Sequence, residues 1–239
     1  MLELRGVSKA FGGVKAVDTV TMSILAGEVR GLIGPNGAGK STLVNLISGL
    51  LTHSAGTISL DGTPLDGLST QARAKKGLAR TFQNLRVFPS LTVRQNIDVA
   101  SYAGAASKRG NDIVAEAILR FDLSGLLNAP ASALAYGQLR RLEIVRALAL
   151  RPRVLMLDEP AAGMNETETA ALNTALQWVR DQSDCALLVI DHDLKFIMSL
   201  CEQITVLNLG AVIADGTPNE VTENRQVIDA YLGENHNAA

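Results

Sequence analysis

The feature that most constrains this chain is a glycine-rich stretch directly after an apolar run. Residues 29–33 read VRGLI, residues 34–42 read GPNGAGKST, and the segment after them reads as a helix. The stretch fits G-x-x-x-x-G-K-[ST], in which glycines let backbone amides face phosphate oxygens. The start of the following helix would add its positive dipole end at the same place. Strand, glycine turn and helix in this order predict a phosphate-binding site.

The residues of this stretch predict separate contacts with a bound triphosphate. Lys40 would bridge the β- and γ-phosphates as a point charge, Ser41 would ligate Mg²⁺, and Thr42 would reach the α-phosphate. The turn would bind phosphate mainly through backbone amides. Its candidate residues are Asn36, Gly37, Ala38 and Gly39.

A second apolar run, at 154–157, ends in two acids, Asp158 and Glu159. At the carboxyl end of a strand, Asp158 could hold Mg²⁺ beside the phosphate-binding turn, and Glu159 could orient or deprotonate an attacking water. Taken alone, the acids could equally be a solvated turn. Beside a phosphate site, hydrolysis is the better interpretation.

Short apolar or β-branched runs predict the strands of the chain. They lie at 2–7, 20–25, 29–33, 57–60, 154–157, 186–190 and 204–207. The runs at 29–33, 154–157 and 186–190 are nearly continuous in apolar character, as expected of central parallel strands covered on both faces. Glycines at 12–13 and 62 predict antiparallel hairpins at an edge, and a hairpin over 208–214 is expected to close the sheet.

Strand signals are absent between about 90 and 150, where apolar residues recur at helical spacing. This segment predicts a helical insert whose last helix stops before Pro152, because proline disfavours helical geometry in the residue before it. A loop is expected at 101–111 within the insert, and the tail at 234–239 is expected to fray.

Further motifs stand in the order found in the ATP-binding-cassette ATPase family, which the chain resembles over nearly its whole length. Gln83, in RTFQN, matches the glutamine loop that touches Mg²⁺ and reports nucleotide state, and His192 matches the switch histidine. The resemblance implies ATP as the nucleotide. It also implies catalytic roles for Glu159, His192, Gln83 and Lys40, with Ser41, Gln83 and Asp158 as the Mg²⁺ ligands.

The resemblance implies an α/β fold of one domain over 1–239. Its core would be a P-loop NTPase of the RecA-like type, with an antiparallel β subdomain at the edge and an inserted α-helical subdomain. Residues 1–83 and 153–239 would form the catalytic core, and residues 84–152 the helical subdomain.

The sequence LAYGQ at 134–138 occupies the family's signature position. In the family this motif contacts ATP held by another subunit, so the resemblance implies a homo- or heterodimer in which Ala135, Gly137 and Gln138 complete the opposite site. A glycine allows close backbone approach, and the following helix dipole favours an anion. Ala135 stands where the family has serine; the lost hydroxyl donor predicts weaker ATP-driven dimerisation and slower hydrolysis rather than a dead site.

Two further expectations concern residues around these motifs. Phe11 stands at the family's aromatic position and is expected to stack on adenine, with a place in the core as the alternative. Three arginines follow the signature and are expected to form a solvated basic face. They are Arg140, Arg141 and Arg146.

Several departures resemble the subgroup that serves importers of branched-chain amino acids and related amides or urea. Tyr136 replaces a glycine of the signature, Asn165 replaces an aspartate, and the segments 80–88, 191–198 and 215–233 also fit. The subgroup implies transmembrane permease partners, contacted near Gln83 and 86–91, and a solute-binding protein that acts indirectly. The expected location is cytoplasmic, peripheral on the inner face of the cell membrane.

Composition restricts the alternatives. The 22 Lys and Arg against 24 Asp and Glu give a formal net charge of -2, so no nucleic-acid partner is expected. No run approaches the ~20 apolar residues that span a bilayer, no signal peptide is recognisable, and the two cysteines match no disulfide or metal pattern. Three rivals remain: a lipid or lipopolysaccharide exporter subunit, a soluble cassette ATPase of DNA repair or ribosomes, and a nucleotide-gated binding module with negligible turnover.

Overall fold

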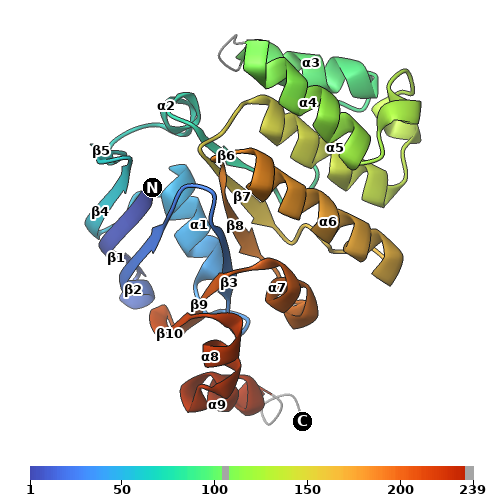
Figure 1. Ribbon diagram of the computed structural model, residues 1–239. Coiled ribbons are helices and arrows are strands. Elements are labelled where there is room, and N and C mark those ends of the chain that lie inside the picture. Colours follow the sequence, from blue (N-terminus) through green and yellow to red (C-terminus); the bar gives the residue numbers. More distant parts are fainter. Residues whose placement is uncertain (104–107, 235–239) are drawn as a thin grey trace.

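The computed structural model describes residues 1–103 and 108–234, and at its centre lies a six-stranded sheet of order β10-β9-β3-β8-β7-β6 (Figure 1). Pairing is parallel from β9 to β6, and β10 pairs antiparallel with β9. The strands are β3 (Val29–Ile33), β6 (Leu78–Arg80), β7 (Val154–Asp158), β8 (Ala186–Ile190), β9 (Gln203–Asn208) and β10 (Ala211–Gly216). The parallel centre and the closing hairpin confirm the predictions; β6, only three residues long, was not predicted.

The central strands are apolar because each buries both faces. In β7, Leu155 and Leu157 pack into the core on one side of the sheet, while Val154 and Met156 pack into the core on the other side. Successive side chains of a strand point to opposite faces, so a strand covered on both sides needs apolar residues at every position.

A second, antiparallel sheet of order β2-β1-β4-β5 covers one side of the molecule. Its strands are β1 (Leu2–Phe11), β2 (Val14–Ile24), β4 (Ala55–Leu60) and β5 (Thr63–Pro64). Helix α1 (Lys40–Ser48) lies between the two sheets (Figure 1), where Leu43 and Leu46 pack in one core with Leu4. The predicted antiparallel edge subdomain is confirmed.

Helices cover the other side of the central sheet, and those within residues 84–152 form the insert (Figure 1). They are α3 (Val93–Ala103), α4 (Lys108–Arg120), α5 (Tyr136–Ala149), α6 (Glu166–Gln182) and α7 (Leu194–Leu200), with short 3₁₀ turns at Ser124–Leu126 and Ala131–Ala133. Helix α5 ends before Pro152, as predicted. The loop expected at 101–111 is wrong where the structure describes it, because α3 and α4 extend into it; residues 104–107 lie outside the described residues.

Three further helices are short: α2 (Thr70–Lys75), α8 (Pro218–Glu223) and α9 (Arg225–Glu234). Of the tail that was expected to fray, Glu234 is the last residue of α9, and residues 235–239 lie outside the described residues. The two cysteines are buried and unbridged, and burial raises the pKa of Cys185 and of Cys201 to about 12, so both thiols stay protonated at neutral pH.

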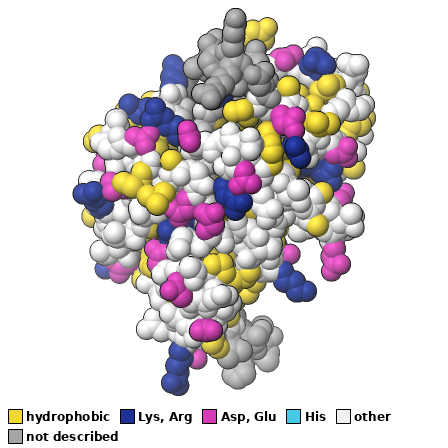
Figure 2. Space-filling view, viewed as in Figure 1, with side chains coloured by type: hydrophobic (Ala, Val, Ile, Leu, Met, Phe, Trp, Pro, Cys, Tyr) yellow, Lys and Arg dark blue, Asp and Glu magenta, His cyan; other side chains and the backbone are white. Residues whose placement is uncertain are grey.

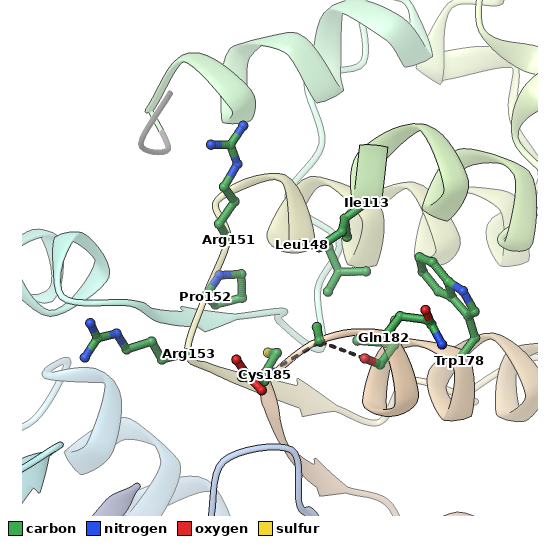
Figure 3. Close-up of a pocket in the computed structure, with 11 residues that line it drawn as sticks. Ile113, Leu148, Arg151, Pro152, Arg153, Trp178, Gln182 and Cys185 are labelled. Carbon is green, nitrogen blue, oxygen red and sulfur yellow. Dashed lines mark hydrogen bonds between the residues drawn. The ribbon is translucent and has the colours of Figure 1, made fainter. Parts of the chain in front are cut away.

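The helical insert rejoins the core through Arg151, Pro152 and Arg153, at the rim of a cavity of about 250 Å³ (Figure 3). Leu148 of α5 and Trp178 of α6 lie on opposite sides of this cavity. The cavity thus lies between the insert and α6, beside the boundary expected at 152/153.

The surface shows no field of a single charge on the face in Figure 2, where Lys and Arg lie among Asp and Glu side chains. Within the described ranges 1–103 and 108–234, none of the helices has the length and apolar character needed to cross a membrane.

Candidate active site

The turn between β3 and α1 exists because two glycines lie against neighbouring backbone. Gly34 has φ 144° and Gly39 has φ 102°, values that favour glycine. A Cβ on Gly34 would lie 2.0 Å from the Leu207 carbonyl oxygen, and one on Gly39 would lie 2.3 Å from the Ala16 carbonyl oxygen. Side chains at these positions are excluded by backbone, which cannot move aside cheaply.

Lys40 begins α1 and folds back over this turn. Its Nζ donates hydrogen bonds to the carbonyl oxygens of Gly34 (2.6 Å) and Pro35 (2.9 Å). The residue before it, Gly39, provides no side-chain cap for α1. An ammonium group and the uncapped N-terminus of a helix therefore line one cavity, and both groups attract anions.

The turn lines a cavity of about 530 Å³ that also receives the ends of β7 and β8. The cavity is lined by the predicted residues Asn36, Gly37, Ala38, Gly39, Lys40, Ser41, Thr42, Gln83, Asp158, Glu159 and His192, and also by Ala16, Gly34, Pro35, Ile190, Asp191 and Tyr231. These segments converge because the carboxyl ends of parallel strands meet at one edge of a sheet. The predicted phosphate, metal and catalytic residues thus share one cavity.

Glu159 lies in this cavity with its carboxylate between two other predicted residues. Gln83 Nε2 donates to Glu159 Oε2 at 3.3 Å, and His192 Nδ1 lies 3.9 Å from Glu159 Oε1. The backbone of Glu159 has φ 48°, a strained value for a residue with a side chain, and its N–H donates to the Ile190 carbonyl oxygen at 2.7 Å. That hydrogen bond holds the Glu159 backbone against the end of β8.

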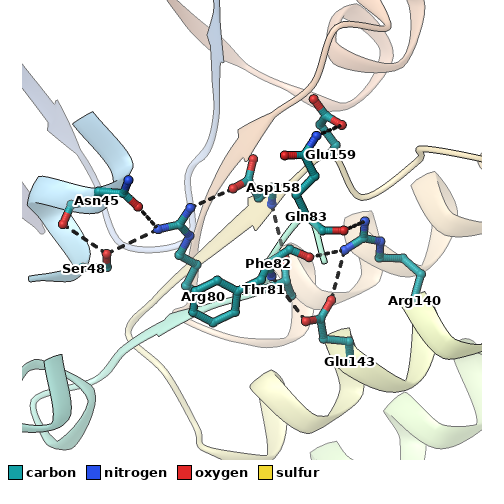
Figure 4. Close-up of polar contacts among 10 residues, drawn as sticks. All are labelled: Asn45, Ser48, Arg80, Thr81, Phe82, Gln83, Arg140, Glu143, Asp158 and Glu159. Carbon is teal, nitrogen blue, oxygen red and sulfur yellow. Dashed lines mark hydrogen bonds and ion pairs between the residues drawn. The ribbon is translucent and has the colours of Figure 1, made fainter. Parts of the chain in front are cut away.

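Asp158 is buried beside Glu159 and is held by Arg80, a residue to which the sequence assigned no role. Arg80 Nη2 donates to Asp158 Oδ2 at 2.8 Å, and its Nη1 donates to Asn45 Oδ1 at 2.5 Å (Figure 4). Asp158 N–H also donates to Thr81 Oγ1 at 3.2 Å. In the sequence, only the position of Arg80 at the start of RTFQN could have suggested its contact with Asp158.

The donor set of the cavity fits Mg²⁺ with a nucleotide. No group of three or more His, Cys, Asp or Glu that could hold a metal alone occurs within residues 1–103 and 108–234. The cavity instead offers a hydroxyl, a carboxylate and an amide oxygen, from Ser41, Asp158 and Gln83. Mg²⁺ prefers such oxygen donors and usually keeps waters and substrate phosphates as its other ligands.

The glutamine loop, residues 81–92, is fastened to α5 by a buried ion pair. Arg140 is fully buried, and its Nη1 donates to the Phe82 carbonyl oxygen at 2.6 Å and to Glu143 Oε2 at 3.0 Å (Figure 4). Glu143 Oε1 accepts the N–H groups of Phe82 (3.3 Å) and Arg86 (3.2 Å). Burial raises the pKa of the Glu143 carboxyl, against the lowering effect of the Arg86 amide and of Arg140.

The expectation of a solvated basic face on α5 is therefore wrong for Arg140, because its guanidinium is buried and pairs with the Glu143 carboxylate. It is also wrong for Arg146, which donates to the Arg86 carbonyl oxygen and lies 4.9 Å from the Phe88 ring centroid. The Arg141 side chain is only 12% exposed and lies 3.5 Å from Asp122 Oδ2.

Comparison with known proteins decides the family. The sequence model described as "ABC transporter" matches residues 17–162, more than half of the 239 residues. The chain belongs to the ABC transporter family. A second model, "Branched-chain amino acid ATP-binding cassette transporter", matches residues 211–237 of this cassette.

Relatives match the cassette over nearly its whole length. It is 40% identical to the high-affinity branched-chain amino acid transport ATP-binding protein BraF of Pseudomonas aeruginosa, with 98% of each chain covered. It is 39% identical to LivG of Escherichia coli, a protein of the same description (98% of each). It is 32% identical to the lipopolysaccharide export system ATP-binding protein LptB of E. coli (98% of this chain, 97% of LptB). This ABC cassette is a transport ATPase.

Solved structures of ABC cassettes have the same fold as this chain. The ADP conformation of MJ1267, an ATP-binding cassette of an ABC transporter, matches with a TM-score of 0.87 at 26% identity and 98% coverage of both chains. The dimeric post-hydrolysis state of the cassette MJ0796 bound to ADP and Pi matches with a TM-score of 0.78 at 26% identity, covering 91% of this chain and 99% of that chain. The predicted α/β cassette fold is confirmed.

The signature of this ABC cassette lies away from its own cavity. Ala135 is the exposed residue before α5, and none of Ala135, Gly137 and Gln138 is among the described residues that line the cavity. The Ala135 N–H donates to Gln138 Oε1 at 3.0 Å. This is half of a reciprocal helix cap, because the alanine side chain has no oxygen to accept an amide of α5 in return.

Phe11 is the predicted residue that the structure does not bring to the cavity. It ends β1 with 47% of its surface exposed, and Lys9 Nζ lies 5.2 Å from its ring centroid. Its hairpin contributes Ala16 to the cavity lining instead. The core alternative is wrong for so exposed a ring, and adenine stacking stays a prediction.

Replacing Ala135 by serine is expected to raise the free energy of unfolding of this ABC cassette by about 1 kcal/mol, because the hydroxyl completes the cap of α5. ATP turnover is also expected to rise, because in the expected dimer the serine hydroxyl would donate a hydrogen bond to the γ-phosphate held by the other subunit. Urea unfolding and steady-state phosphate release measure the two effects. Ala133→Ser, at an exposed alanine before the helix, is the control. Turnover equal to the parent's would refute the role given to position 135.

Replacing Glu143 by glutamine is expected to lower the free energy of unfolding by about 3–5 kcal/mol, because it leaves the Arg140 charge buried and unpaired. Urea unfolding checks this. Glu223→Gln, at an exposed glutamate of α8, should change stability by less than about 0.5 kcal/mol. Equal effects of the two variants would show that the Arg140–Glu143 pair does not stabilise the fold.

Proposed function

We propose that this cassette is the ATP-hydrolysing subunit of an importer of branched-chain amino acids or related amides or urea. The observation that carries the ATPase role is the convergence of Lys40, Asp158 and Glu159 on one cavity. The substrate class is supported by the branched-chain match over 211–237 and by the 40% identity to BraF, against 32% to the lipopolysaccharide exporter subunit LptB.

The cavity residues divide the work of hydrolysis. Lys40 binds the β- and γ-phosphates, backbone amides of 36–39 bind phosphate oxygens, and Ser41, Gln83 and Asp158 hold Mg²⁺, which neutralises charge on the phosphates. Glu159 orients and deprotonates the attacking water. Gln83 and His192 lie on either side of the Glu159 carboxylate, so they keep it aimed into the cavity.

A second subunit completes the site. The signature residues Ala135, Gly137 and Gln138 lie outside the cavity lining of their own chain, which is compatible with their contacting the nucleotide of the other subunit. Support comes from the dimeric cassette MJ0796 bound to ADP and Pi. The partner is another copy of this chain or a related nucleotide-binding subunit, and Phe11 covers adenine at the edge of the site.

The cassette binds transmembrane permeases, and this binding holds it as a peripheral protein on the cytoplasmic face of the membrane. The glutamine loop offers the contact surface, with Phe88 45% exposed and Arg146 lying over its ring. Arg140 bonds the Phe82 carbonyl oxygen, and Glu143 accepts the Arg86 N–H, so the glutamine loop connects the nucleotide-binding core, 1–83 and 153–239, to the helical subdomain, 84–152, which contacts the permeases. A solute-binding protein acts only through the permeases.

Two variants separate binding from hydrolysis. Glu159→Gln should lower steady-state phosphate release about a hundredfold or more, because it removes the general base, while MgATP affinity stays within twofold. Lys40→Ala should weaken MgATP binding at least about tenfold, because a charged phosphate contact is lost. Calorimetric titration and a phosphate-release assay measure these effects, with Lys76→Ala as the exposed-lysine control. Phosphate release by Glu159→Gln equal to the parent's would instead indicate a binding module.

The substrate class is tested on the intact complex, isolated from its own cells through a tag on this chain and placed in liposomes. Leucine together with the solute-binding protein should raise ATP turnover several-fold and drive leucine uptake, and the complex with Glu159→Gln should show neither. Stimulation by lipopolysaccharide without any response to leucine, isoleucine, valine, amides or urea would favour the exporter alternative.

A further inference from the structure

Helix α9 brings a tyrosine into the nucleotide cavity. Tyr231 lines the same cavity as Lys40 and His192, although the family's general sequence model ends at residue 162. Figure 1 shows α8 and α9 at the end of the central sheet where β3 passes into α1. Tyr231 lies within 211–237, the segment matched by the branched-chain model.

The orientation of Tyr231 is set by the caps and the packing of α9. Asn224 Oδ1 accepts the N–H groups of Gln226 (2.9 Å) and Val227 (3.4 Å), which fixes the start of the helix. Val227 is buried in the core, and Tyr231, four residues later on the same face, packs partly buried against that core. One helix face therefore holds both the anchor and the tyrosine.

The hairpin that leads into this segment is bonded to the phosphate-binding turn. Gly210 N–H, in the turn between β9 and β10, donates to the Ala38 carbonyl oxygen at 3.0 Å. The buried Arg30 of β3 donates to Asp215 Oδ1 of β10 at 2.5 Å. The C-terminal segment is thus connected to the phosphate site at its base as well as at Tyr231.

Tyr231 approaches from the side of the cavity that carries the catalytic residues. The hydrophobic core against which Tyr231 packs includes Phe196 and Ile197 of α7, the helix that follows His192. The other core, which contains α1 and the sheet that ends in Phe11, lies across the central strands. Tyr231 therefore shares its core with the helix that follows His192 and not with the sheet that carries Phe11.

We propose that the Tyr231 hydroxyl donates a hydrogen bond to the phosphate chain of bound nucleotide, so that the C-terminal segment is part of the nucleotide site. The inference rests on the proposed ATPase role of the cavity. A phenol hydroxyl is a hydrogen-bond donor, and donation to a charged phosphate oxygen is roughly twice as strong as a neutral hydrogen bond.

Tyr231→Phe removes the hydroxyl and keeps the ring. Its affinity for the non-hydrolysable analogue adenylyl imidodiphosphate with Mg²⁺ should fall about tenfold in calorimetric titrations, while adenosine affinity stays unchanged. Tyr102→Phe, at a tyrosine 90% exposed on α3, should bind like the parent. Analogue affinity within twofold of the parent, or an equal loss for adenosine, would overturn the proposal.

A second measurement uses the unaltered chain and so does not depend on how the variant folds. Nitration by tetranitromethane, mapped by mass spectrometry, should fall several-fold at Tyr231 when the Mg²⁺ analogue is added and stay constant at Tyr102. Equal nitration of Tyr231 with and without the analogue would overturn the proposal. Lys40→Ala distinguishes failure of the tyrosine proposal from failure of the ATPase role. If Lys40→Ala binds the analogue like the parent, the ATPase role itself is wrong. If Lys40→Ala binds the analogue more weakly while Tyr231→Phe binds it like the parent, only the tyrosine contact is refuted.

Discussion

The nucleotide site depends on the close approach of one turn to two neighbouring carbonyl groups. Gly34 and Gly39 lie so near the backbone of Leu207 and Ala16 that a Cβ at either position would overlap it. This contact places the turn at the carboxyl edge of the central sheet and starts α1 at Lys40. The acids that follow β7 and the histidine that follows β8 belong to the same edge, so the chemistry of the cavity follows from the position of this turn.

The buried pair of Arg140 and Glu143 gives the site its mechanical link. It joins the backbone of the glutamine loop to the helix that begins with the signature. Breaking a buried charge pair is costly, so loop and helix behave as one body. Gln83, bonded to the Glu159 carboxylate, stands at one end of that body, and the signature stands at the other. Gln83 and the helix that begins with the signature are therefore connected through one set of contacts.

Much of this could be predicted from the sequence, because the relevant patterns are local. Continuous apolar runs identified the central strands, and the order of motifs identified the cavity residues. Local patterns failed for β6, which is too short to show a period, and for the loop at 101–111, where Ala, Gly and Ser residues do not prevent helix formation. They also failed for Arg140, because the spacing of charges on a helix does not reveal a buried partner.

The sequence by itself determined the phosphate-binding turn, the strand that ends in two acids and the stop of α5 before Pro152, because each depends on the conformations that a few consecutive residues can adopt. The tertiary structure decided which distant residues meet. Arg80 on Asp158, Glu143 on the glutamine loop and Tyr231 in the cavity are long-range contacts. Such contacts form only when strands and helices pack, since hydrogen bonds and ion pairs depend on distance in space and not on separation along the chain.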